Sequence, residues 1–256
     1  METALAPLAT VSLFFLAVVA CAFTLAGLVK GVIGMGLPTV AVGILGLVMP
    51  PAQAAAILVI PSLVTNIWQL AAGPRFGALL KRLWSLLLGV CLGTWAGTLM
   101  FGGAGTGWAS IALGTALIAY AAIGLANVRF SVPPRLEPWL SPLVGAATGI
   151  VTSATGVFVI PAVPYLQALQ LEREDLIQAL GLNFTVSTIA LAGGLLHSGL
   201  LQPAIAGFAA LALVAALAGM FLGQKLRSRI RPETFRRCFF VGMLLLGIHL
   251  TVRGLL

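Results

Sequence analysis

The sequence predicts an all-α, polytopic transmembrane protein built from two inverted repeats. Apolar residues make up 60% of its 256 positions and charged residues only 8%. A soluble domain carries about 25% charged residues because its surface must stay hydrated, so this chain is expected to lie in lipid. Its apolar residues form runs too long for barrel strands, which favours helices. Glycine patterns recur between the two halves of the chain, and equivalent connections differ in charge.

Short connections rich in glycine, proline or charge separate the apolar segments. Each segment is expected to be helical, because a helix satisfies its own backbone polar groups within hydrocarbon. No basic region precedes the first segment, so residues from Leu8 onward are expected to stay as membrane structure rather than to be cleaved as a signal peptide. The segments cover residues 8–28, 32–49, 53–72, 83–101, 108–127, 140–151, 156–169, 175–196, 202–223 and 238–254.

Matching glycine pairs indicate an internal duplication. Gly27-Leu-Val-Lys-Gly31 aligns with Gly145-Ala-Ala-Thr-Gly149, and Gly93-xxx-Gly97 aligns with Gly219-xxx-Gly223. The pairs keep their order and similar spacing, as duplicated units do. We therefore predict one transmembrane domain, residues 1–256, that consists of repeat one, residues 1–127, and repeat two, residues 138–256.

The charges of the connections predict the orientation of the two halves. The connection at 73–82 holds three basic residues and its counterpart at 195–203 none, while that at 224–237 holds six and its counterpart at 102–107 none. Basic connections remain cytoplasmic. Equivalent connections are therefore expected on opposite sides of the membrane, an inverted arrangement found in many secondary transporters. We predict a multi-pass protein of the cell inner membrane, with connections 73–82 and 224–237 cytoplasmic and both termini periplasmic.

Each half is predicted to hold a broken helical hairpin followed by three transmembrane helices. In the second half the hairpin limbs, 140–151 and 156–169, are shorter than the ~20 residues that a crossing needs. That hairpin is expected to be re-entrant, entering and leaving the membrane on one side.

The hairpins are predicted to break at residues 30–38 and 148–156, where glycine and proline gather. Irregular backbone at membrane depth persists only where protein or water covers it. A helix that starts after such a break directs free N–H groups and its positive dipole end towards a ligand, which suits an anion. Close helix packing is the alternative role of these glycines. The predicted substrate-binding residues at the breaks are Lys30, Gly31, Gly34, Gly36, Pro38, Thr152, Ser153, Thr155 and Gly156.

Lys30 is the only charged residue between Glu2 and Arg75. A lysine inside a transport core would hold an anionic substrate directly. Alternatively, its amine reaches water from the cytoplasmic end of a full-length helix. Thr148 takes the equivalent place in the second half, so the two halves are not expected to be chemically symmetric.

Polar residues within the third segment and its counterpart are predicted to line the same pathway. These residues are Asn66, Gln69, Asn183 and Ser187. The alternative for each is a hydrogen bond between helices, worth about 0.6 kcal/mol.

Several function classes are disfavoured. The net charge of +8 does not indicate nucleic acid, since six of the 14 basic residues lie in one run, 225–237, and the others flank apolar segments. The three cysteines lack CxxC spacing and are interpreted as small core residues, so no metal and no cofactor is predicted.

No GxxxxGK[ST], HExxH or GxSxG motif is present, and we predict that the protein is not an enzyme. All six acidic residues lie at termini or in connections, so no buried carboxylate is expected to relay protons or to bind sodium in the usual way.

Two stretches carry a resemblance to a known family. They read G-L-V-K-G-V-I-G-M-G-L-P-T-V from Gly27 and A-A-I-L-V-I-P-S-L-V-T-N-I-W-Q from Ala55, with looser counterparts G-A-A-T-G-I-V-T-S-A-T-G from Gly145, Q-A-L-G-L-N-F from Gln178 and G-M-F-L-G from Gly219. In this order they resemble the TauE/SafE sulfite exporter family, also called the toluene sulfonate uptake permease family. The resemblance implies an inner-membrane permease that moves sulfite, sulfoacetate or related organosulfonates, commonly outward.

Together these observations predict a secondary transporter of small anions that works by alternating access between the two repeats. Its expected partners are a small anionic substrate and the lipid bilayer, and the sequence leaves a homo-oligomer open. Two alternatives remain: a channel or permease for a different small solute, and a non-transporting membrane subunit.

Overall fold

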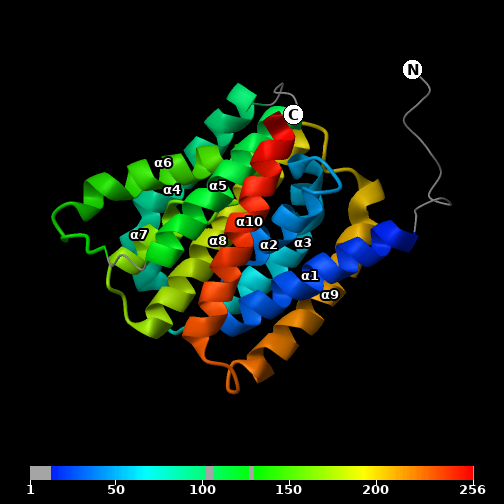
Figure 1. The fold of residues 1–256 in the computed structure, drawn as a ribbon. Coiled ribbons are helices and arrows are strands. Elements are labelled where there is room, and N and C mark those ends of the chain that lie inside the picture. The colour runs from blue at the N-terminus through cyan, green and yellow to red at the C-terminus, as the bar shows by residue number, and fades with distance from the viewer. Residues whose placement is uncertain (1–12, 102–105, 127–129, 256) are drawn as a thin grey trace.

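The structure, a computed structural model, describes residues 13–101, 106–126 and 130–255 (Figure 1). Within these ranges it contains ten α-helices, one short 3-10 helix and no β-strand. The elements are α1 Leu13–Ile33, α2 Leu37–Leu45, α3 Pro51–Ala71, α4 Phe76–Phe101, α5 Thr106–Ala126, α6 Glu137–Thr155, α7 Ala162–Ala168, α8 Arg173–His197, η2 Pro203–Ile205, α9 Ala206–Leu226 and α10 Pro232–Leu255. The predicted helical start at residues 8–12 and the periplasmic N-terminus fall outside the described residues.

Seven helical segments of the described chain are long and apolar enough to cross a membrane. They are 13–33, 51–71, 76–101, 107–126, 173–197, 203–226 and 233–255. Large apolar side chains on their outer faces are exposed, among them Trp84, Leu92 and Phe221. Such a surface is stable only against hydrocarbon. The prediction of an all-α, polytopic membrane protein is therefore confirmed.

The helices pack in four main pairs: α1 with α9, α4 with α6, α3 with α8 and α5 with α10. The predicted glycine pairs lie in the first two of these contacts. A Cβ added to Gly27 would come within 2.1 Å of the Ala216 carbonyl oxygen, and one added to Gly145 within 2.1 Å of the Leu86 carbonyl oxygen. Only glycine permits backbones to approach this closely. Packing, the alternative role of these glycines, thus accounts for Gly27 and Gly145.

The first hairpin breaks between α1 and α2, within the predicted range. Gly34 and Gly36 take left-handed φ angles of 78° and 104°, which glycine adopts without strain. The helix continues through Lys30 and Gly31 to Ile33, so the break is shorter than the predicted 30–38. A Cβ at Gly36 would lie 3.4 Å from the ring of Phe239 in α10, which locates the bend inside the helix bundle.

The second hairpin differs from the prediction. Helix α6 has 19 residues, more than the predicted limb 140–151, and α7 has only 7. The helix begins earlier because Pro138 suits a first turn. It also continues through Thr148, Thr152 and Thr155, whose hydroxyls bond to carbonyls four residues back, and it ends only at Gly156, with φ 73°. The predicted break from residue 148 onward is therefore wrong up to residue 155.

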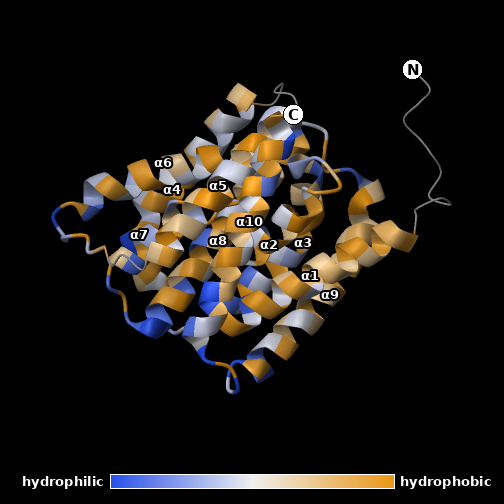
Figure 2. Cartoon of the chain, in the orientation of Figure 1, coloured by the Kyte–Doolittle hydropathy of each residue, from blue (hydrophilic) through white to orange (hydrophobic). Residues whose placement is uncertain are grey.

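The connections predicted to be cytoplasmic gather at one end of the bundle. Arg75 pairs with Asp175 at 2.9 Å, and the Val132 amide donates to the Ala168 carbonyl at 3.0 Å. Figure 2 shows hydrophilic residues at this end, in the connections that follow α5, α7 and α9. Polar residues collect here because this end faces water rather than lipid.

The cysteines were expected in the core, and this expectation is wrong. Cys21, Cys91 and Cys238 are all exposed on the helix surfaces. In lipid, a small apolar side chain gains nothing by turning inward, because the solvent is as apolar as the protein interior.

Candidate functional site

Lys30 lies in the last turn of α1 and is buried, with 5% of its surface exposed. Its Nζ donates to the Thr65 hydroxyl at 3.0 Å and to the Asn66 side-chain oxygen. Both acceptors belong to α3. The ammonium thus points into the bundle and does not reach water at a helix end.

The acceptors of Lys30 are neutral. The ion pairs among the described residues join Arg75 to Glu172 and Asp175 and join Arg82 to Glu137, all at the end that holds the polar connections. None includes Lys30. A buried charge is costly unless it is paired and hydrogen-bonded, so this ammonium is solvated by α3 but not neutralised.

The contact of Lys30 continues as a directional chain of hydrogen bonds from α3 to α8. The Asn66 amide donates to the Ser62 hydroxyl at 2.9 Å. The Thr188 hydroxyl donates its one proton to the Phe184 carbonyl at 2.6 Å. In the 3.1 Å contact between Ser62 and Thr188, Ser62 must therefore be the donor. Because lysine can only donate, the Asn66 oxygen must face it, which fixes the orientation of this amide.

A second polar group lies on α4 and α8. Asn183 and Ser187 are completely buried and Thr94 is 1% exposed, yet their side-chain polar atoms have no hydrogen-bond partner within the described chain. Native proteins leave few buried polar groups unpaired, and each one calls for an explanation. The ring of Phe184, next to Asn183, lies 5.5 Å from that of Phe158, just beyond the second hairpin break.

The remaining predicted residues differ in their surroundings. Gln69 donates to the Ile177 carbonyl at 2.9 Å, one of the bonds between α3 and α8, while its oxygen is unpaired. Gly31 packs against α9, where a Cβ would meet the Met220 carbonyl at 2.3 Å. Ser153 bonds to Ile150 within its own helix and lies against Gly97 of α4. These contacts fit helix packing, and a substrate role for Gln69, Gly31 and Ser153 stays a prediction.

The predicted residues at and beside the hairpin breaks differ in how closely they are packed. Gly34 has open space where a Cβ would be, and Pro38 is buried in the first turn of α2. Thr152 and Thr155 are buried, and their hydroxyls donate within α6. Gly156 lies against Ala55 of α3.

Sequence reasoning missed Ser62, Thr65 and Thr94. A usable signal existed for Ser62, since a serine and an asparagine four residues apart share one helix face. No comparable signal marks Thr65 or Thr94, because threonine is common as a helix-internal hydrogen-bonding residue in membranes.

The model of the sulfite exporter TauE/SafE family matches residues 19–250, a range that includes Lys30, both hairpin breaks and all of α8. The chain belongs to the TauE/SafE family. This is a family of membrane transporters, so the chain is a multi-pass transport protein rather than only a helical membrane protein. Neither a curated protein nor a solved structure matches it.

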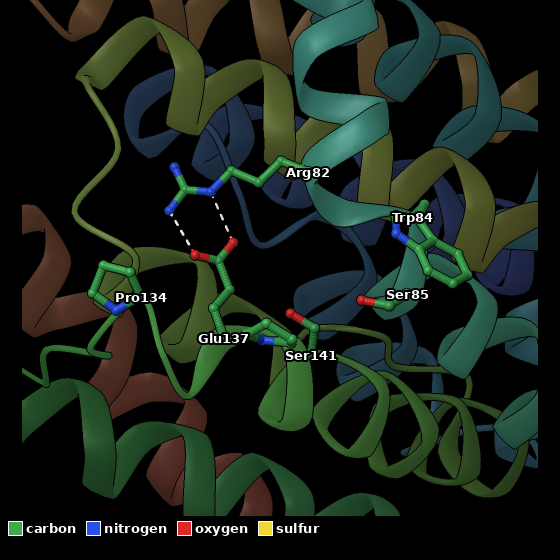
Figure 3. A pocket seen from close by; sticks show the side chains of 7 residues that line it. Arg82, Trp84, Ser85, Pro134, Glu137 and Ser141 are labelled. Atoms are coloured by element: carbon green, nitrogen blue, oxygen red, sulfur yellow. Dashed lines mark hydrogen bonds and ion pairs between the residues drawn. The ribbon is translucent and has the colours of Figure 1, made fainter.

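Two pockets of this TauE/SafE protein lie at opposite ends of the bundle. One, of about 280 Å³, lies between α4 and α6 beside the Arg82–Glu137 ion pair at 2.8 Å, as Figure 3 shows. The other, of about 270 Å³, is lined mainly by apolar residues and reaches Gln53 and Ile57 near the start of α3. Ile57 lies about 7.5 Å along the axis of α3 from Ser62, the residue through which the hydrogen bonds of Lys30 and Asn66 continue to α8.

Proposed function

We propose that the protein is a secondary transporter of small sulfur-containing anions such as sulfite or an organosulfonate, and that Lys30 binds the anion. The observation that carries the proposal is a buried ammonium whose hydrogen-bond acceptors in the described part of the chain are the neutral oxygens of Thr65 and Asn66. An anion that enters supplies the missing countercharge. Membership of the TauE/SafE family supports the sulfur oxyanion as the substrate class.

The start of α2 supports the same site. Its first N–H groups have no side-chain cap, and its N-cap residue Gly36 belongs to the same break that follows Lys30. Free N–H groups and the positive dipole end of a helix favour an anion. Lys30 and the first turn of α2 would thus bind the anion from two sides, with the α3 and α8 polar residues lining its path.

We further propose alternating access between two inverted repeats. The helix pairs support this arrangement. If α1–α5 correspond to α6–α10 in order, then the α1–α9 contact maps onto the α6–α4 contact, while α3–α8 and α5–α10 map onto themselves. A pseudo-two-fold axis produces such a pattern.

The test is anion flux in proteoliposomes that contain the purified protein. Lys30→Ala should abolish flux, because the substrate loses the ammonium proposed to bind it, while Lys81→Ala at the polar end should leave flux unchanged. Size-exclusion profiles and melting temperature would show that Lys30→Ala is folded, and Lys30→Met, which keeps more of the side-chain volume, serves as a second variant.

Unchanged flux in a folded Lys30→Ala protein would contradict the role of Lys30. Saturation of flux with substrate concentration, and competition between anions, separates a transporter from a channel. Flux by the purified chain alone counts against a subunit that does not transport.

A further inference from the structure

We propose that the pocket between α4 and α6, at the polar end of the bundle, binds the phosphate headgroup of an anionic phospholipid such as phosphatidylglycerol. Its lining residues come from the second and third turns of α4, the turn before α6 and the start of α6. This lipid site is separate from the proposed anion site at Lys30 and does not depend on it.

The Arg82 guanidinium provides the first contact for a phosphate. Two of its N–H groups donate to the two carboxylate oxygens of Glu137 at 2.8 and 2.9 Å, and Figure 3 shows this pair among the pocket residues. A guanidinium has five N–H groups, so three remain available. The Arg82 side chain is 41% exposed and that of Glu137 only 13%. The cation can therefore meet a ligand, while the mostly buried carboxylate holds it in place.

The charge around the pocket favours an anion. Arg135, in the turn that leads into α6, is exposed and takes part in none of the ion pairs of the described chain. It directly follows Pro134, which lines the pocket, and the one carboxylate among the lining residues is that of Glu137. Two arginines thus face a single acid. Arginine binds phosphate oxygens through parallel N–H donors, so a phosphate group fits this cluster.

Two tryptophans indicate that the pocket lies at the boundary between lipid and water. Trp84 follows Arg82 by two residues and Trp139 follows Glu137 by two, so both lie near the depth of the Arg82–Glu137 pair. Both tryptophans are exposed on the surface of the bundle. Tryptophan is enriched where a membrane protein meets the headgroup region. A ligand at this depth is therefore more readily a lipid than a dissolved phosphate.

The surface beyond the pocket suits acyl chains. Leu88 and Leu143 lie one helical turn beyond the two tryptophans, and both are exposed. Between them the helices are in close contact, since a Cβ on Gly89 would lie 2.4 Å from the Pro142 carbonyl oxygen. The space between α4 and α6 therefore closes towards the membrane centre, and apolar surface continues outside it. Charged, aromatic and aliphatic side chains follow one another in the order in which a phospholipid presents its headgroup and chains.

A bound headgroup would also join α4 to the second hairpin. Ser85 of α4 and Ser141 of α6 both line the pocket. The Ser141 hydroxyl lies 2.7 Å from the Tyr165 hydroxyl of α7, across the hairpin. The Ser85 hydroxyl makes no side-chain hydrogen bond within the described residues and can donate to a phosphate oxygen. A phosphate bound by Arg82 and Ser85 would therefore stabilise the folded state, which a melting temperature can detect.

The test measures the melting temperature of the purified full chain in detergent with dioctanoyl phosphatidylglycerol, dioctanoyl phosphatidylethanolamine or glycerol phosphate. A ligand stabilises the folded state according to its occupancy. Phosphatidylglycerol should raise the melting temperature by a few degrees. Phosphatidylethanolamine should raise it less, because its ammonium cancels the phosphate charge, and glycerol phosphate should have little effect because it has no acyl chains.

Two variants with matched controls locate the site. Arg135→Gln should raise the half-saturating concentration of phosphatidylglycerol about fivefold, as expected for one arginine beside an anionic lipid. Arg229→Gln, an equally exposed arginine in the connection after α9, should leave it unchanged. Ser85→Phe adds a ring inside the pocket and should abolish the response without a change of charge. Ser228→Phe, at an exposed position of the same end, is its control. Arg135→Gln is expected to fold, because Arg135 is exposed in a turn.

Three results would overturn the proposal. The first is an equal rise, or no rise, with the two phospholipids. The second is a rise with glycerol phosphate equal to that with phosphatidylglycerol, because the pocket would then bind a free phosphate. The third is a response in Arg135→Gln and Ser85→Phe that equals the response in their controls.

Lys30→Met separates the lipid site from the proposed function. This variant should lose the rise in melting temperature with sulfite and keep the rise with phosphatidylglycerol. A normal sulfite response in Lys30→Met would contradict the proposed anion site and leave the lipid site intact. Loss of the phosphatidylglycerol response in Lys30→Met would contradict the lipid site between α4 and α6.

Discussion

Arg75, in the connection between α3 and α4, forms a 2.9 Å ion pair with Asp175 in the first turn of α8. Gln178 strengthens this contact, since its amide donates to the carbonyls of Leu70 and Gly73 and its oxygen accepts from the Arg75 backbone. The polar end of the bundle is therefore closed between α3 and α8, while a pocket opens at the other end of α3.

We expect this ion pair to control access from the polar end. Arg75→Asp should reduce flux, because two carboxylates then repel each other across the contact, and the double variant Arg75→Asp with Asp175→Arg should restore part of it. The Arg75 side chain is half-exposed, so the coupling in a double-mutant cycle should be no more than about 1 kcal/mol. Equal flux in the single and double variants would exclude a role of this pair in gating.

Asn66→Asp should inactivate transport without unfolding the protein. It gives Lys30 a permanent carboxylate partner that competes with the substrate anion for the ammonium. Flux should fall at least tenfold, and sulfite should no longer raise the melting temperature. Asn66→Gln is the matched control, since it keeps the amide and adds no charge. A transport rate in Asn66→Asp equal to that of Asn66→Gln would show that the anion does not bind at Lys30.

Gly27→Ala should destabilise the protein by about 1–3 kcal/mol, because the new methyl group overlaps the Ala216 backbone. Gly242→Ala in α10 meets no atom within 4 Å and should be neutral or stabilising by up to about 1 kcal/mol, through helix propensity alone. Thermal melts in one detergent compare the two. Similar losses in both would mean that α1 and α9 are not in contact at Gly27.

Cysteine labelling checks the predicted topology. In a background that lacks Cys21, Cys91 and Cys238, a cysteine at exposed Ser228 should react with an impermeant maleimide only after the inner membrane is opened. A cysteine at Ser198, in the connection without basic residues, should react in spheroplasts with an intact inner membrane. The reverse pattern would invert the proposed orientation.

Composition and the order of apolar segments were enough to predict the helical membrane fold, because lipid leaves helices as the main solution for a chain of this kind. The positions of the hairpin bends followed from Gly34, Gly36 and Gly156, whose left-handed φ angles require glycine. The full length of α6, Glu137–Thr155, was not predicted from the sequence. Threonine lowers helix propensity in water, but Thr148, Thr152 and Thr155 satisfy their hydroxyls on the helix itself and therefore continue it.

At the candidate site, Lys30 could be predicted because it is the only charged residue between Glu2 and Arg75. Of its two hydrogen-bond partners, Asn66 was predicted as a pathway residue and Thr65 was not. The direct contact of Asn66 with Lys30 depends on how α1 approaches α3. The contacts of Gln69 could not be inferred, since a polar residue in a crossing serves packing and transport equally well. Local sequence does not encode which helix faces which.

The pairing of α1 with α9 and of α4 with α6 has a consequence for how the molecule is put together. The glycine-bearing helix before each hairpin bend packs against a membrane-spanning helix from the other half of the chain: α1 against α9, and α6 against α4. The two halves pack against each other through these helix pairs. Neither half expressed alone could therefore keep its close helix contacts, α1–α9 and α4–α6. The moving bodies of a transport cycle would accordingly mix segments from both ends of the chain, and assembly would have to wait until α9 has been synthesised.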